Sequence, residues 1–368
     1  MTKAENVIAI TALGDPRDPK TWSGTPNNII KALEHQGYTV LSIDASIKKY
    51  QRLAYLLLHR VSGLGIDELR GPIARSHSAK IVQRQIQTLG CTKILHLGTF
   101  QLPLPKLDPG VEHYLFCDST WDSWSQYVTT INQYTPKMLN LSDKLERESY
   151  AQIKHFFTIS QYVRENLIER YQVEPKRISV VGTGRGKIEP YTGEKDYKNG
   201  HILFVAKGRF KDKGGDLLLE GFKTAQRKNP SLKLVIVGRE EYQKLADSIP
   251  NVTVKGYISW EELQNLFHTA ALFAMPALNE PWGLVYLEAL ACKTPILGLN
   301  RNSLPEITCE GKYGFLVDEP TPDCIADTIL KAFSEPEKLK QMGAEGQKYC
   351  LETFSWNLVA SKIAEIMI

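Results

Sequence analysis

The sequence predicts an α/β fold built from two successive sheets of mainly parallel strands. Short apolar runs alternate with longer segments of helical period along the whole chain, which is typical of α/β layers. At 368 residues the chain is too long for one ordinary core, so two domains are expected. A glycine-rich stretch without an apolar period, residues 182–200, separates the halves. We therefore place the domain boundary between residues 183 and 184.

Composition narrows the class of protein further. Hydrophobic residues make up 42% of the chain, and the formal charge of +4 is small for this length, so net charge does not suggest nucleic-acid binding. We find no apolar run near the roughly 18 residues of a spanning helix, and no signal peptide at the N-terminus. The six cysteines are scattered without a CxxC pair, so we expect reduced core thiols in a cytoplasmic protein.

The first half predicts strands joined by helices. A helix is expected over 28–36, with Thr25 as its N-cap, Pro26 at its first position and Gly37 at its end. A second helix runs from Ser160 to Tyr171. The expected strands are 7–10, 38–43, 94–97, 114–117, 155–159 and 178–181.

The second half repeats this pattern. Helices are expected over 215–226, 260–269 and 284–291. The expected strands are 202–206, 232–237, 253–255, 272–275, 295–299 and 315–318. Two sheets in succession, with polar loops late in the second, suggest a ligand cleft between them.

The most informative segment is residues 279–288. Glu280 and Glu288 bracket seven residues, a turn runs from Asn279 to Gly283, and a helical apolar pattern follows. The N-terminus of a helix attracts phosphate, and Glu288 lies about one turn inside this helix. An acid beside a phosphate site needs a neutral group to hold, such as sugar hydroxyls. The segment therefore predicts a site for a nucleotide that carries a sugar.

A series of motifs in order resembles family 4 glycosyltransferases, which are retaining enzymes of the GT-B fold. The resemblance covers most of the chain and is strongest over about 155–310. Its pieces are Phe157-Thr-Ile-Ser-Gln-Tyr-Val, Ile178-Ser-Val-Val-Gly, Ile202-Leu-Phe-Val-Ala-Lys-Gly-Arg-Phe-Lys-Asp-Lys-Gly-Gly-Asp, Lys233-Leu-Val-Ile-Val-Gly, Val254-Lys-Gly-Tyr-Ile, the double-glutamate segment, Ser303-Leu-Pro-Glu-Ile and Phe354-Ser-Trp.

The resemblance implies two Rossmann-like domains that face each other across a cleft. The first, 1–183, is the acceptor-side domain, and a C-terminal helix, 354–368, crosses back to it; the second, 184–353, binds the nucleotide sugar. It also implies transfer of a hexose, with retention, to a hydroxyl of a carbohydrate or lipid-linked acceptor, in polysaccharide or glycolipid synthesis. We favour a UDP-glucose-type donor over GDP-mannose. The donor is a substrate, and no cofactor is expected. Since no DxD triplet occurs, we expect no metal.

Cationic and acidic residues of the second domain carry the expected chemistry. Lys213, with Lys207 or Arg209, is expected to hold the diphosphate, and the sequence leaves open which of the latter two does so. By resemblance, Glu280 contacts the donor sugar and Glu288 the ribose. The backbone N–H groups expected at the phosphate belong to Gly283, Leu284 and Val285, and the nucleotide side carries Tyr257 and Ile258. Lys293 and Arg301-Asn302 depart from the family, which often has glycine there.

The first domain offers fewer candidates. Asp118 follows an apolar strand and either faces the donor sugar or caps a helix. His96 ends another strand and either faces the cleft or is a buried histidine. Gly24 fits a backbone close to the distal phosphate. Trp121 and Trp124 are more consistent with core packing than with an acceptor platform.

Residues 47–87 hold eight Lys/Arg against two acids and an apolar run at 53–58. Some family members dock on membranes through such a segment, so contact with the inner membrane surface stays open beside a solvated helix.

Three other functions compete with sugar transfer as interpretations of this sequence. An NAD-dependent oxidoreductase would need GxGxxG, but Gly182-Thr-Gly-Arg-Gly has another spacing, and no helical period follows it. A nucleotide-sugar epimerase or hydrolase of the same fold remains an alternative. So does a non-catalytic protein that binds a sugar nucleotide.

Overall fold

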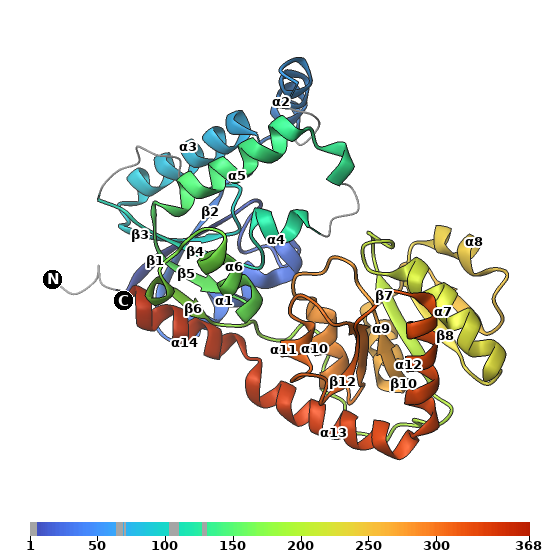
Figure 1. Ribbon diagram of the computed structural model, residues 1–368. Helices are drawn as coiled ribbons and strands as arrows, with labels where there is room; N and C mark the ends of the chain where they lie inside the picture. The colour runs from blue at the N-terminus through green and yellow to red at the C-terminus, as the bar shows by residue number, and fades with distance from the viewer. Residues whose placement is uncertain (1–5, 64–68, 70, 103–109, 127–130) are drawn as a thin grey trace. The chain divides into compact units, whose positions relative to one another are not determined.

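The computed structural model describes residues 6–63, 69, 71–102, 110–126 and 131–368 (Figure 1). The chain divides into two compact units. Unit 1 contains residues 1–184 and 355–368, and unit 2 contains residues 185–354. The chain therefore leaves unit 1 once and returns to it with its last helix.

The described part of unit 1 forms a six-stranded sheet in which all neighbouring strands are parallel, in the order β2-β1-β3-β4-β5-β6. Its strands are β1 (Val7–Ala12), β2 (Thr39–Asp44), β3 (Lys93–Leu97), β4 (Glu112–Cys117), β5 (Ile153–Thr158) and β6 (Ile178–Val180). Its helices are α1 (Thr25–His35), α2 (Lys49–Val61), α3 (Pro72–Leu89), α4 (Trp121–Ser125), α5 (Pro136–Tyr150), α6 (Gln161–Glu169) and α14 (Trp356–Met367).

Helices cover both faces of this sheet, with α3 and α5 on one side and α1 and α14 on the other (Figure 1). The inner strands are mostly apolar, because both of their faces are covered. Ile8 and Ile10 of β1 and Ile94 and Leu95 of β3 have no exposed surface.

One predicted helix start is wrong in detail. Thr25 is the first residue of α1, and Gly24 is its N-cap, with a left-handed φ of 85°. The cap makes no side-chain hydrogen bond, so glycine is used here for its backbone freedom and not for a capping side chain.

The described part of unit 2 forms a second six-stranded parallel sheet, in the order β12-β11-β10-β7-β8-β9. Its strands are β7 (His201–Ala206), β8 (Leu234–Gly238), β9 (Val252–Lys255), β10 (Ala270–Ala274), β11 (Ile296–Leu299) and β12 (Gly314–Val317). Its helices are α7 (Gly215–Lys228), α8 (Gln243–Ala246), α9 (Trp260–Thr269), α10 (Leu284–Ala291), α11 (Leu304–Ile307), α12 (Pro322–Ser334) and α13 (Pro336–Thr353).

The strand order of unit 2 fixes where a ligand belongs. The chain winds outward from β7 through β8 to β9, then returns to β10 on the other side of β7. Parallel sheets of this kind bind ligands where the winding reverses, beyond the carboxyl ends of the two central strands. In unit 2 that place lies after Ala206 and after Ala274.

The structure also tests the expected burial of the cysteines and the expected absence of a membrane-spanning helix. The prediction of core thiols is wrong for Cys309, which is exposed, whereas Cys91, Cys117, Cys292 and Cys350 are buried. Within the described residues, no helix has the length and apolar character needed to span a membrane.

Candidate functional site

Two loops meet at the point where the winding of unit 2 reverses. One follows β7 and carries Lys207, Arg209 and Lys213, and the other follows β10 and ends at Gly283. The backbone N–H groups of Leu278 and Asn279 donate to the carbonyl of Asp212 at 2.7 and 3.0 Å. The sheet topology and these bonds therefore hold the lysine-rich loop against the loop of Glu280.

Lys213 and Glu280 form an ion pair across the two loops. The lysine Nζ lies 3.2 Å from the glutamate Oε2, and the two side chains are 21% and 16% exposed. The next residue, Gly214, has a left-handed φ of 75°, and a Cβ there would lie 1.9 Å from the carbonyl oxygen of Pro276. Glycine is required at this position because the two loops touch through their backbones.

The two cations that the sequence could not separate differ in their contacts. The guanidinium of Arg209 donates to the Asp212 carboxylate and to the Asn279 carbonyl, both at 2.9 Å. Lys207 is exposed, and among the described residues no hydrogen-bond or ion-pair partner holds its ammonium. Arg209 thus ties the loops together, while the charge of Lys207 is available for a ligand.

Helix α10 begins at this site. Its N-cap, Gly283, has a left-handed φ of 80°, and a Cβ there would lie 2.7 Å from the ring of Tyr286. The first helical N–H groups, which include those of Leu284 and Val285, have no carbonyl one turn earlier within the helix. A helix start of this kind carries a partial positive charge.

Glu288 lies one turn inside α10, partly buried against the start of unit 2. Its Oε1 accepts the backbone N–H of Lys187 at 3.1 Å, and a Cβ on Gly186 would lie 1.9 Å from the same oxygen. Burial raises the pKa of the Glu288 carboxyl to about 7, although the Lys187 N–H and the charge of Lys207 act in the opposite direction. Glu288 therefore changes its charge near neutral pH.

Gly186 and Lys187 are residues of this site that sequence reasoning missed. They lie in the stretch that was assigned to the domain boundary. The available signal was the glycine at 186, which leaves room for the Glu288 carboxylate. No local pattern could reveal that this segment contacts a helix about a hundred positions later.

The backbone explains why relatives often have glycine at two positions where this chain does not, Lys293 and Asn302. Lys293 and Asn302 both have a left-handed φ of 54°, the conformation that glycine adopts most easily. The Asn302 side-chain amide donates to the carbonyl of Glu280 at 3.2 Å, and the Ser303 hydroxyl donates to the carbonyl of Pro281 at 2.6 Å. These bonds hold the backbone of the glutamate loop.

The nucleotide-side candidates lie on the loop that follows β9. Tyr257 is 70% exposed, and its hydroxyl donates to the carbonyl of Lys207 at 3.1 Å. Ile258 is partly exposed beside it. An exposed aromatic ring fixed at one end is suited to stack on a planar group.

In unit 1, Asp118 follows β4 at the carboxyl end of the sheet. The Tyr162 hydroxyl donates to its backbone carbonyl at 3.1 Å, and the Ser119 hydroxyl donates to its carboxylate at 3.3 Å. The N-cap of α4 is Thr120, whose hydroxyl accepts the N–H of Ser123. The helix-capping alternative for Asp118 is therefore wrong.

His96 lies in the core of unit 1. It is fully buried on β3 and pairs with His113 of β4, with 2.9 Å between its Nε2 and the partner's Nδ1. Burial lowers the pKa of both imidazoles, that of His113 to about 4, so both are neutral near pH 7. This placement favours the alternative of a buried histidine.

The remaining candidates of unit 1 are Trp121, Trp124 and Gly24. Trp121 is 4% exposed and stacks on Trp124, with 5.4 Å between the ring centroids. Gly24 is buried at the start of α1.

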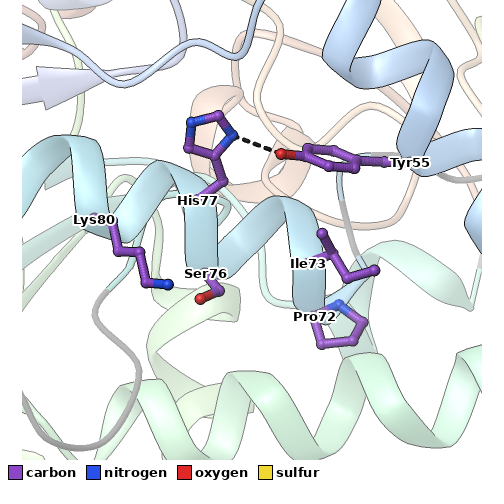
Figure 2. A pocket seen from close by; sticks show the side chains of 6 residues that line it. All are labelled: Tyr55, Pro72, Ile73, Ser76, His77 and Lys80. Carbon is purple, nitrogen blue, oxygen red and sulfur yellow. Dashed lines mark hydrogen bonds between the residues drawn. The ribbon is translucent and has the colours of Figure 1, made fainter.

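A separate pocket of about 600 Å³ lies between α2 and α3 of unit 1 (Figure 2). Its lining includes the Tyr55 hydroxyl, which lies 2.8 Å from Nδ1 of His77, together with Ser76 and Lys80. None of the predicted site residues lines it. Across the described residues, no group of three or more His, Cys, Asp or Glu side chains is placed to hold a metal ion.

The fold of this chain matches that of known structures. A crystal structure of WaaG, a glycosyltransferase involved in lipopolysaccharide biosynthesis, matches with a TM-score of 0.70 at 15% identity, covering 98% of this chain and 99% of that one. At this identity the match shows the fold. Two parallel sheets with flanking helices form the two-domain α/β fold of GT-B glycosyltransferases, as the sequence predicts.

The sequence of unit 2 is similar to that of known glycosyltransferases. Residues 191–349, somewhat less than half of the chain, match the family model described as glycosyl transferases group 1. An alpha-maltose-1-phosphate synthase of Mycolicibacterium smegmatis is 23% identical over 61% of this chain and 66% of its own length. A GDP-mannose-dependent mannosyltransferase of the same organism is 30% identical over 42% of this chain and 44% of its own length. The chain thus spans between 44% and 66% of the length of these relatives.

Proposed function

We propose that this protein is a glycosyltransferase that moves a hexose, with retention, from a nucleoside diphosphate to an acceptor hydroxyl. The observation that carries the proposal is the convergence in unit 2 of Lys213, Glu280 and the N-terminus of α10, with Glu288 one turn inside the helix. Each group suits one part of a sugar nucleotide. The family of residues 191–349 supports the same class of reaction.

The leaving diphosphate needs positive charge as its bond to the sugar breaks. Lys207, Lys213 and the first N–H groups of α10 supply that charge in our proposal, and no metal ion is needed in it. Arg209 is left out of the phosphate contacts, since Asp212 and the Asn279 carbonyl already hold its guanidinium.

In this proposal each of the two glutamates binds one of the two sugars of the donor. Glu288 accepts hydroxyl hydrogens of the ribose, with its carboxylate oriented by the Lys187 N–H. Glu280 contacts hydroxyls of the transferred hexose and exchanges its partner Lys213 for them when the diphosphate binds. Asp118 of unit 1 is the proposed polar contact of that unit to the donor sugar.

The donor remains our prediction of a UDP-glucose-type sugar. One relative's name specifies GDP-mannose, so both nucleotides belong in the test. A thermal-shift panel of UDP, GDP, UDP-glucose and GDP-mannose identifies the base, because a ligand that binds only the folded state raises the melting temperature.

Consumption of the donor with and without acceptor separates the alternatives. A transferase converts UDP-glucose to UDP at a rate that depends on an acceptor such as a lipid-linked or free oligosaccharide. An epimerase turns the donor over without an acceptor, a hydrolase releases free hexose, and a binding protein does neither. Any of these last three outcomes contradicts the proposal.

We propose in addition that α2 brings the protein to an anionic membrane surface. Five large side chains of this one helix are strongly exposed, namely Tyr50, Leu53, Leu57, Leu58 and Val61. Residues 48–61 include four Lys/Arg and no acid. An apolar face with basic neighbours lies at the boundary of headgroups and acyl chains, and Lys80 of the adjacent pocket adds to the positive charge (Figure 2).

Sedimentation with vesicles tests this contact. The protein should sediment at low salt with vesicles that contain phosphatidylglycerol and less with pure phosphatidylcholine. Leu53→Asp combined with Leu57→Asp should abolish binding, whereas the control Leu245→Asp, on an exposed residue of unit 2, should not. Equal sedimentation of all three proteins would exclude α2 as the contact.

A further inference from the structure

Two lysines hold the C-terminal end of helix α10, which is the end away from the candidate site. Lys195 reaches toward the helix from another segment, and Lys293 reaches from the helix end back to that segment. Residues 187–197, the latch segment, run along the C-terminal end of this helix. Lys195 reaches from the latch segment to the helix end, and Lys293 reaches from just beyond the helix back to the latch segment. The ammonium of Lys195 donates to a backbone carbonyl at the helix end, and the ammonium of Lys293 donates to backbone carbonyls of the latch segment.

Lys195 binds the C-terminal ends of two helices at once. Its Nζ lies 2.7 Å from the carbonyl oxygen of Cys292, 2.9 Å from that of Phe267 and 2.5 Å from the hydroxyl of Thr294. Among the described residues no carboxylate neutralises it. Burial lowers the pKa of its ammonium to about 7, and the negative ends of α9 and α10 favour the charged form.

Lys293 makes the return contact. Its Nζ donates to the carbonyls of Thr192 and Gly193 at 3.2 and 3.0 Å. Its backbone has a left-handed φ of 54°, a conformation that is strained for a residue with a Cβ. Glycine would avoid this strain, so the side chain of Lys293 offsets the strain through the contacts it makes with the latch segment.

Further bonds connect the latch segment to Glu288. The N–H of Tyr191 donates to the carbonyl of Ala291 at 3.1 Å, and the Tyr197 hydroxyl donates to that of Lys293 at 2.7 Å. The first residue of the segment, Lys187, donates its N–H to the Glu288 carboxylate at 3.1 Å. The segment that closes the end of α10 thus also orients the acid one turn inside it.

We propose that Lys195 and Lys293 form a two-way latch that fixes α10 and the latch segment in register, and thereby sets the position of Glu288 for the ribose. Both are positioning residues, because neither contacts the proposed ligand. The inference rests on the proposed function for its ligand, but the latch itself is a property of unit 2.

Three variants separate the latch from general stability. Lys195→Met keeps the length of the side chain and removes its charge. Lys293→Gly removes the ammonium and also relieves the backbone strain, so the fold should be retained. Lys198→Met is the matched control, since Lys198 is exposed just beyond the latch segment.

Amide hydrogen exchange reports on the latch without any ligand. In both latch variants we expect exchange in peptides covering 185–192 and 284–292 to be about tenfold faster, with the strands β7 and β10 unchanged. The control should match the wild type. Unchanged exchange in both latch variants would overturn the proposal, whatever the activity of the protein.

Ligand binding then tests the positioning role. The Kd of the preferred nucleoside diphosphate should rise about tenfold in both latch variants, since Glu288 is displaced, while the Kd of inorganic pyrophosphate should stay within about twofold. Equal weakening of both ligands would indicate loss of fold and contradict positioning. If the wild type binds no nucleotide, the proposed function fails, and hydrogen exchange alone decides the latch.

Discussion

The ammonium of Lys213 and the carboxylate of Glu280 lie 3.2 Å apart, although they come from loops that follow different strands. Both side chains are largely buried, so the pair is screened from water more than a surface ion pair. A bound diphosphate would compete with Glu280 for the lysine and leave the glutamate available for sugar hydroxyls. Through this ion pair, phosphate binding to Lys213 would free the carboxylate of Glu280 to accept hydrogen bonds from the sugar.

Replacing Lys213 by Ala should weaken binding of the nucleoside diphosphate by about tenfold or more, because a charge-assisted contact to phosphate is lost and Glu280 is left unpaired. Isothermal titration with UDP and GDP measures the effect. Lys211→Ala, an exposed lysine of the same loop, is the control and should bind as the wild type does. Equal affinities for all three proteins would remove Lys213 from the phosphate site.

Lys207 and Arg209 should respond differently to truncation. Lys207→Ala should lower nucleotide affinity with little change in melting temperature, because no described partner holds its ammonium. Arg209→Ala should lower the melting temperature by several degrees, since the bonds to Asp212 and to the Asn279 carbonyl are lost. Thermal unfolding combined with titration separates the two roles, and the reverse pattern would make Arg209 the phosphate ligand.

The charge of Glu288 should make donor affinity dependent on pH. Its carboxyl has a raised pKa of about 7, so it is mostly protonated at pH 6 and mostly ionised at pH 8. Because the ionised form accepts ribose hydroxyls better, the Kd of the sugar nucleotide should fall as pH rises through 7. In Glu288→Gln this slope should disappear. A slope that survives in the variant would belong to another group.

Gly186→Ala should disturb the same carboxylate from the opposite side. The new Cβ would lie 1.9 Å from Glu288 Oε1, so the acid must move, and nucleotide affinity should fall by about tenfold. Gly256→Ala is a fitting control, because the three atoms nearest to its Cβ all belong to the flexible side chain of Glu240. Titrations of both variants that match the wild type would show that Glu288 needs no fixed position.

The buried pair of His96 and His113 should make unit 1 sensitive to acid. The folded pKa of His113, about 4, lies below its ordinary value of 6.5, so the unfolded chain binds the proton first as pH falls. Stability present above pH 6.5 is then lost between pH 6.5 and pH 4, by at most about 3 kcal/mol for this residue. Denaturant unfolding of the wild type should show a steeper loss over this range than His113→Leu. Parallel curves would contradict the prediction.

Sequence patterns predicted most of the fold because they are local. Each sheet has strands with continuous apolar runs, such as β1 and β7, and α9 and α10 have the bounds that their apolar period indicates. The start of α1 was misjudged because Gly24 caps it by a left-handed backbone, whereas the pattern favoured the side chain of Thr25. Capping by a backbone conformation has no polar residue to signal it.

The candidate site was predictable only in part. Glu280 and Glu288 stand in one short motif, but the contact of Gly186 with Glu288 joins distant segments. The choice between Lys207 and Arg209 depends on the neighbours Asp212 and Asn279, which spacing alone does not place in contact. Likewise, His96 ends a strand as many exposed site residues do, and only the presence of His113 on the adjacent strand explains its burial.

The return of α14 to unit 1 has a consequence for a shortened chain that lacks this helix. Val359, Ala360 and Ile363 of this helix are buried in unit 1, where it packs on α1. Without this helix one side of α1 is uncovered, whereas every strand and helix of unit 2 lies before residue 355. A chain that ends at residue 354 should therefore recruit chaperones through the first unit rather than the second.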